Sequence, residues 1–243
     1  MRYIFLREIF SYFGSINGYV IGVFFLLSLG LILWVFPDFS ILYYPYATLD
    51  SFFYAAPIVF LFMVPAMTMR SFSEEWRLGT MELLLTKPLS EWSLVFGKML
   101  AHFVLVWIVL LCTVVYYWTV YALGSPPGNI DSGGVVGSYI GLALLGMVFV
   151  SIGLFSSVLT SNQVVAFLLA VFLSAIVYWG FELIADLPVF RGVWDDWIMK
   201  LGIAWHYASI RRGVIDIEDV SYFLSLIAIF TIATAYVIRS KHG

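Results

Sequence analysis

Six segments of the chain are continuously apolar, and each is long enough to cross the hydrocarbon core of a bilayer as a helix. None has an acid or a base at its centre, and none alternates apolar with polar residues as a transmembrane β-strand does. The pattern predicts an all-α polytopic membrane protein with one domain over residues 1–243. The predicted spans are 18–36, 52–69, 99–123, 139–159, 164–184 and 220–238.

The composition supports this fold class and excludes several others. Hydrophobic residues make up 63% of the chain and charged residues only 11%, whereas soluble domains are about a quarter charged. A single cysteine cannot form a disulfide framework within the chain. The net charge of −3, without any block of basic residues, argues against nucleic acid as a partner.

The distribution of basic residues predicts the orientation. If both termini are cytoplasmic, eight of the twelve bases lie in inner segments, and the other four lie in the last outer segment. Cytoplasmic loops carry an excess of lysine and arginine. We therefore expect both termini, and the loop between the second and third spans, on the cytoplasmic side.

That inner loop is long enough for secondary structure of its own. Gly79 interrupts one helix, Thr80 can cap the next, and Pro88 ends it. Ser90 followed by Glu91 starts the helix that leads into the third span. We expect two short amphipathic helices on the cytoplasmic surface, which on this pattern alone are either a solvated interfacial hairpin or an element that docks a partner.

The outer stretch 185–219 differs from the other loops because it mixes tryptophans with charges. Apolar residues at 194, 197, 198, 201 and 205 have helical spacing. We predict an amphipathic segment in the outer interface or a short re-entrant helix.

Small residues indicate where helices approach one another. Gly14, Gly18 and Gly22 repeat at every fourth position before and within the first span, and Gly137 and Gly141 do the same at the start of the fourth. Such spacing allows close backbone contact. We expect the stripe of Gly14, Gly18 and Gly22 to face a second subunit.

The chain lacks the motifs of an enzyme or of a self-powered pump. It has no phosphate-binding Gly-x-x-x-x-Gly-Lys-[Ser/Thr] sequence and no zinc-protease or serine-hydrolase motif. The span centres also lack the ionisable residues of proton-coupled carriers. We therefore expect no catalysis and no cofactor in this chain.

The inner loop resembles the signature of ABC-2 type transporter permeases. In that signature a phenylalanine and acids precede Gly-Thr-x-Glu-x-Leu-Leu, a proline and a Gly-Lys pair. The matching residues are Phe72, Glu74, Glu75, 79–84, Pro88, Gly97 and Lys98. Within that family the chain is similar to the gliding-motility-associated permeases of Bacteroidetes, through 65–73, 83–90, 162–167 and 212–216.

The resemblance implies a six-helix permease of a bacterial cytoplasmic membrane, paired with a second, different membrane subunit. Cytoplasmic ATPase subunits would bind ATP and Mg²⁺ and drive the assembly. The inner-loop helices would couple to the ATPase through Phe72, Glu74, Glu75, Trp76, Gly79, Thr80, Glu82 and Pro88. Two alternatives stay open: a copper or maturation-type permease of the same superfamily, and a membrane anchor that relays ATPase movement without transport.

Overall fold

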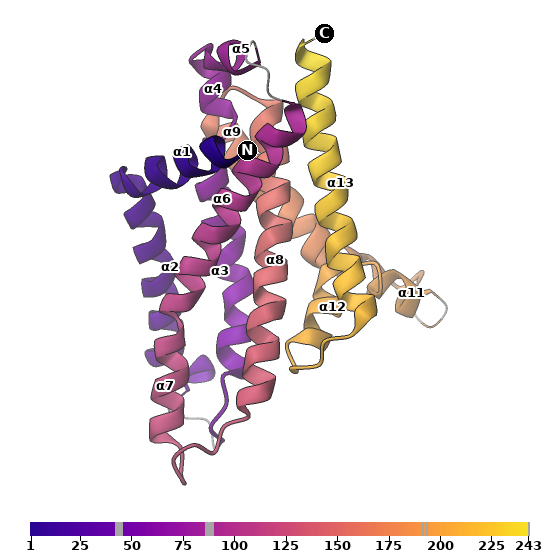
Figure 1. Ribbon diagram of the computed structural model, residues 1–243. Coiled ribbons are helices and arrows are strands. Elements are labelled where there is room, and N and C mark those ends of the chain that lie inside the picture. Colours follow the sequence, from indigo (N-terminus) through magenta and orange to yellow (C-terminus); the bar gives the residue numbers. More distant parts are fainter. Residues whose placement is uncertain (42–45, 86–89, 191, 193, 243) are drawn as a thin grey trace.

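The computed structural model describes residues 1–41, 46–85, 90–190, 192 and 194–242, and these fold into a bundle of helices without strands (Figure 1). Five helices in this part of the chain are long and apolar enough to cross a membrane. The bent pair α1–α2 makes a sixth when it is taken as one span. The predicted fold class, an all-α polytopic membrane protein, is confirmed.

Each predicted span overlaps one long helix or one set of consecutive helices. These are α2 (Ile16–Trp34), α3 (Asp50–Thr68), α6 (Glu91–Cys112) with α7 (Val114–Leu123), α8 (Ser132–Leu159), α9 (Gln163–Ala175) with the π-helix η2 (Ile176–Gly180) and α10 (Phe181–Ala185), and α13 (Ile217–His242). A short 3₁₀ helix, η1 (Pro37–Phe39), follows α2.

The helices α6 and α8 begin well before the predicted spans because their capping residues lie upstream of the apolar run. Ser90 Oγ accepts the Ser93 N–H at 3.2 Å, so α6 starts at Glu91, as predicted for the helix that leads into the third span, although the predicted span itself began at 99. Asp131 accepts the Gly134 N–H at 3.0 Å, so α8 starts at Ser132 and not at 139. Side-chain caps of this kind satisfy the free N–H groups of a first turn.

Helix α8 is the centre of the bundle, where it contacts α3, α6, α9 and α13. Its most apolar stretch is 78% buried, compared with 22% for the segment from α9 to α10. Glycines allow this packing: a Cβ at Gly153 would collide with Thr68 Oγ1 of α3, and one at Gly146 would lie 2.9 Å from Val106 of α6. The segment from α9 to α10 is therefore on the periphery, open to lipid or to a partner.

Helix α1 (Arg2–Phe13) has no counterpart among the predicted elements. It lies across the upper end of the bundle in Figure 1, at 68° to α2. Tyr3 and Phe10 are more than 70% exposed on one side, while Ile4 is buried against α6. The helix was missed because it is too short and too polar to read as a span.

The predicted inner-loop helices are present as α4 (Ser73–Arg77) and α5 (Thr80–Leu85). They stand at the same end of the bundle as the C-terminus (Figure 1). Gly79 separates them with a φ of +67°, a left-handed conformation that favours glycine.

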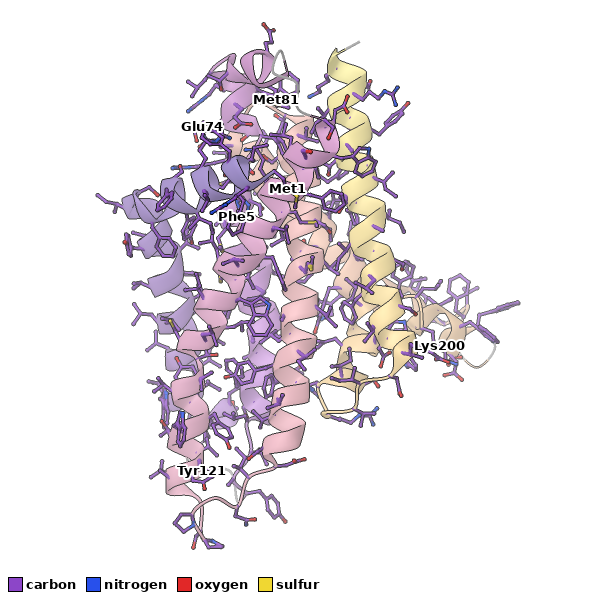
Figure 2. All side chains as sticks on the ribbon, in the orientation of Figure 1. Met1, Phe5, Glu74, Met81, Tyr121 and Lys200 are labelled. Atoms are coloured by element: carbon purple, nitrogen blue, oxygen red, sulfur yellow. The ribbon has the colours of Figure 1, made fainter. Side chains whose placement is uncertain are left out.

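The stretch 185–219 contains two short helices where an amphipathic segment or a short re-entrant helix was predicted. Helix α11 (Asp195–Met199) is on an arm that projects from the bundle, close to the labelled Lys200 in Figure 2. Helix α12 (Ile203–Ile210) instead packs inside, where the Tyr207 hydroxyl donates to the Phe53 carbonyl at 2.8 Å. The tryptophan pattern could not separate the exposed helix from the buried one.

The close approach predicted at Gly137 and Gly141 is confirmed, and it is made within the chain. A Cβ at Gly137 would lie 2.7 Å from the Gly213 carbonyl oxygen, and one at Gly141 would collide with Ile210. These glycines therefore allow the end of α12 and the turn after it to pack closely against α8.

Candidate functional site

The hairpin of α4 and α5 is attached to the bundle at the turn that follows α3. Ser157 Oγ, on α8, accepts the N–H groups of Phe72 at 2.9 Å and Ser73 at 3.0 Å. The same hydroxyl donates to the Met69 carbonyl at 3.0 Å. One buried side chain thus satisfies the backbone where α3 ends and α4 begins, and this fixes the direction in which the hairpin leaves the bundle.

The hairpin presents one surface to solvent and another to the bundle. Leu78, at the turn, is 63% exposed, whereas Phe72 and Met81 are fully buried. Figure 2 shows Glu74 and Met81 at the upper end of the molecule, the end at which α13 finishes. We call the exposed residues the hairpin tip, and they are Arg77, Leu78, Gly79, Thr80 and Glu82.

A buried ion network underlies the hairpin. Lys98 of α6 is 1% exposed, and its Nζ lies 2.7 Å from Glu8 Oε1 and 3.1 Å from Glu75 Oε1. It also donates to the Ser71 carbonyl at 2.6 Å. A buried ammonium is tolerated only when it is paired and hydrogen-bonded in this way. Lys98 therefore joins α1, α4 and the turn before α4 to the start of the third span.

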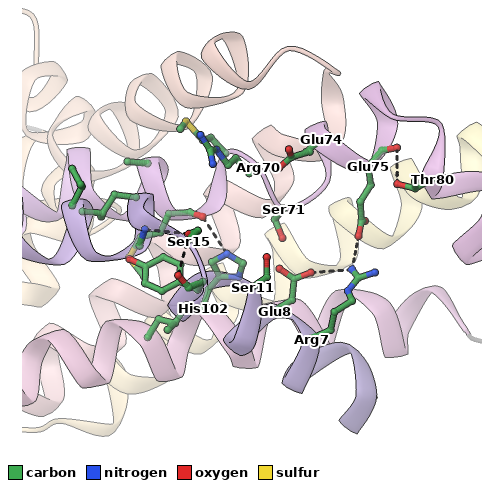
Figure 3. A pocket seen from close by; sticks show the side chains of 18 residues that line it. Arg7, Glu8, Ser11, Ser15, Arg70, Ser71, Glu74, Glu75, Thr80 and His102 are labelled. Atoms are coloured by element: carbon green, nitrogen blue, oxygen red, sulfur yellow. Dashed lines mark hydrogen bonds and ion pairs between the residues drawn. The ribbon is translucent and has the colours of Figure 1, made fainter.

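Arg7 completes the network from the α1 side. Its guanidinium bonds to both Glu8 and Glu75, as the dashed lines in Figure 3 show. Burial alone would raise the pKa of the Glu8 carboxyl, but Lys98, with His102 and Arg7, lowers that pKa to about 2. Glu8 is therefore a carboxylate at neutral pH, held between two cations.

The Gly-Lys pair of the signature has a direct physical role at this point. A Cβ at Gly97 would lie 3.1 Å from the side chain of Ile4 and 3.3 Å from the Met1 carbonyl oxygen. The missing side chain lets α1 lie against α6, and the next residue, Lys98, supplies the cation that binds α1. Sequence reasoning used the pair only as part of a motif.

The structure divides the predicted coupling residues into two groups. Phe72 is buried beneath the Lys98 ammonium, which lies 5.0 Å from its ring centroid, and the Glu75 side chain is only 13% exposed. Both therefore act within the chain. Gly79, Thr80 and Glu82 are exposed on the hairpin tip.

Two further predicted residues lie between these groups. Glu74 is 38% exposed and pairs with Arg77 at 3.6 Å. The ring of Trp76 lies 4.9 Å from Lys241 Nζ, which also donates to the Val158 carbonyl at 2.9 Å. The end of α13 is thereby tied to both α4 and α8. The last predicted residue, Pro88, lies outside the described residues.

Part of the glycine stripe before and within the first span makes close contacts inside this chain. A Cβ at Gly18 would collide with the Tyr12 carbonyl, so Gly18 is needed for the bend between α1 and α2. Gly14 is exposed, and Gly22 is partly exposed, where an added Cβ would lie 4.0 Å from Val109. A subunit interface along this stripe stays a prediction.

Sequence reasoning missed the residues that hold the hairpin from other helices, namely Arg7, Glu8, Ser157 and Lys241. The available signal was charge: Glu8 is the only acid before the first span, and Lys98 is a lone base at the start of the third. No comparable signal marks Ser157 among the other serines of α8.

The described residues contain no group of three or more His, Cys, Asp and Glu side chains that could hold a metal ion. The site is a mechanical connection. It has an exposed tip, a buried base held by ion pairs, and attachments to four of the long helices.

Comparison with known proteins identifies the family. The model of the family described as "ABC-2 family transporter protein" matches residues 44–238, which include the hairpin, Lys98 and all the long helices after α2. No curated protein matches the chain. Because the family model covers most of its length, the chain belongs to the ABC-2 family of transporter proteins and is a multi-pass membrane permease of that family.

Proposed function

We propose that this chain is the transmembrane permease subunit of an ATP-driven ABC-2 transporter, in which cytoplasmic ATPase subunits grip the hairpin tip. The proposal rests on one observation, that the hairpin has an exposed tip and a buried base. Its tip, with Leu78 63% exposed, is free to contact a partner, while its base is tied to the membrane helices through Lys98.

An exposed tip on a firmly attached base can transmit movement of a bound partner to the membrane helices. Force applied to Arg77, Leu78 or Thr80 passes through α4 to Glu75, and from there through Lys98 to α6 and through Ser157 to α8. A coupling free energy between nucleotide state and membrane conformation requires a connection of this kind. ATP and Mg²⁺ bind in the partner, and this chain supplies no cofactor of its own.

The finer assignments rest on sequence resemblance. We propose a second, different membrane subunit, a location in the bacterial cytoplasmic membrane, and a link to gliding motility or associated export. A copper or maturation-type permease has a similar inner loop, and an anchor that relays ATPase movement would use the same hairpin. The genes adjacent to this one would separate the first two.

The test is purification of the full chain in mild detergent, followed by identification of the proteins that accompany it. We expect an ABC ATPase whose hydrolysis rate changes when the permease is present. In a Cys112→Ser background, an Arg77→Cys variant in whole cells should react with a thiol reagent only after the membrane is permeabilised. Labelling of intact cells would place the hairpin outside and would end the proposal.

A further inference from the structure

A cavity of about 490 Å³ lies at the inner corner between α1, the hairpin and the long helices (Figure 3). Part of its lining comes from apolar residues of the spans, among them Val20, Ile21 and Leu105. Val20 is 57% exposed on the flank of α2, where a membrane helix meets lipid. The opposite side of the lining reaches Thr80 on the hairpin tip. The cavity thus extends from the apolar flank of the bundle to its polar end.

Unpartnered polar atoms concentrate on this cavity. Three of its lining side chains carry a buried atom without a hydrogen-bond partner in the described part of the chain: the Tyr12 hydroxyl, Ser71 Oγ and Glu75 Oε2. Ser71 is only 6% exposed, and Figure 3 shows its side chain directed toward Glu8. A buried polar atom without a partner destabilises a fold, because it has lost its hydrogen bonds to water and gained none in return. Three such atoms at one cavity indicate a polar ligand there.

The charges on the lining select the kind of ligand. Carboxylates (Glu8, Glu74, Glu75) and guanidiniums (Arg7, Arg70) both face it, so the site matches a group that carries both signs. Glu75 Oε2 can only accept a hydrogen bond, which calls for an N–H or O–H donor. The arginines suit a phosphate.

We propose that the cavity binds a phospholipid whose headgroup combines a phosphate with a primary ammonium, that is, phosphatidylethanolamine from the adjacent leaflet. The ammonium donates to Glu75, the phosphate is held by Arg7 and Arg70, and the acyl chains leave past Val20. The volume lies within the range of small-ligand sites and holds the headgroup, while the chains remain in the bilayer. The lipid then bridges α1 and α4 beside the Lys98 network.

This inference needs only that the chain is a membrane protein, so its failure and that of the ATPase proposal are distinguishable. The experiment is native mass spectrometry of the delipidated full chain with three lipids of identical acyl chains. Phosphatidylethanolamine offers N–H donors, phosphatidylcholine has the same charges without N–H, and phosphatidylglycerol has no cation. We expect phosphatidylethanolamine to bind roughly tenfold more tightly than either. Equal binding of the three lipids would overturn the proposal.

Variants test the site itself. Ser71→Ala and Tyr12→Phe remove hydroxyls that have no hydrogen-bond partner among the described residues, so they should leave thermal stability unchanged and weaken phosphatidylethanolamine binding several-fold. Ser174→Ala is the matched control, because Ser174 Oγ is also buried and unpartnered but does not line the cavity. Unchanged affinity in the double variant would refute the site. Binding of soluble glycerophosphoethanolamine as tightly as the lipid itself would refute its assignment to a lipid.

Discussion

Lys98 Nζ lies 2.7 Å from Glu8 Oε1, and this contact joins the first helix of the chain to α6 across 90 positions of sequence. The same ammonium holds Glu75 in the hairpin. The exposed tip, and whatever partner binds it, is thereby connected to the N-terminal helix as well as to the spans.

Replacing Lys98 with methionine should destabilise the fold strongly. Glu8 and Glu75 would remain largely buried with only Arg7, whose side chain is 36% exposed, to pair with them, and loss of one partner of a buried ion pair costs about 3–5 kcal/mol. The measurement is thermal unfolding of the purified chain in detergent. Arg77→Met, which removes a cation that is 56% exposed at the same end of the molecule, should change the midpoint little. Equal effects of the two substitutions would contradict the network.

The ionisation of Glu8 should make stability depend on acid pH. Its pKa falls from an ordinary value of 4.5 to about 2 in the folded chain, so folding favours the carboxylate. The stabilisation is complete above about pH 4.5 and is lost as the pH falls toward 2. Unfolding followed at pH 5 and at pH 3 should therefore show less stability at the lower pH. Glu8→Gln should reduce this difference, and an unchanged difference in the variant would assign it to other carboxyls.

Ser157→Ala should loosen the attachment of the hairpin. Two buried N–H groups, of Phe72 and Ser73, would lose their acceptor, at a cost of about 1–3 kcal/mol. Hydrogen exchange of the amides between Met69 and Arg77 should become faster. Ser156→Ala provides the control, since the buried Ser156 hydroxyl donates to the Ile152 carbonyl of its own helix. Similar exchange rates in the two variants would show that Ser157 does not hold the hairpin.

Features that depend on neighbouring residues could be predicted from the sequence, whereas features that depend on tertiary packing could not. Gly79, Ser90 and the apolar runs act on their immediate neighbours, so the helices, and the break between α4 and α5, could be predicted. Glu75 was expected to face a partner, but it is held by Lys98, which is 23 positions away. Its environment depends on tertiary packing, and no periodicity within the loop reports that. Helix α1 was missed for a related reason, because its charged residues Arg7 and Glu8 find partners in Glu75 of α4 and Lys98 of α6, far along the sequence.

Gly153→Ala should disrupt the contact between α3 and α8. The added Cβ would collide with Thr68 Oγ1, and its neighbour Thr68 Cβ would lie only 2.8 Å away, so the helices must separate. Overpacking of this kind typically costs about 1–3 kcal/mol. Gly133→Ala, whose Cβ would meet nothing closer than 3.5 Å, should be tolerated. The comparison of folded yield and unfolding temperature for the two variants decides the point.

Substitutions on the hairpin should separate coupling from folding only when they avoid its base. Glu75→Lys would place a third cation beside Arg7 and Lys98, so its loss of ATPase coupling would be inseparable from damage to the fold. Glu82→Lys and Leu78→Asp alter exposed residues of the tip, so the chain should insert and unfold as before. If the tip is the docking surface, both should lower stimulation of the co-purified ATPase, since a new charge is introduced where an interface would bury it. Full stimulation by both variants, at unchanged expression, would move the docking surface away from the hairpin tip.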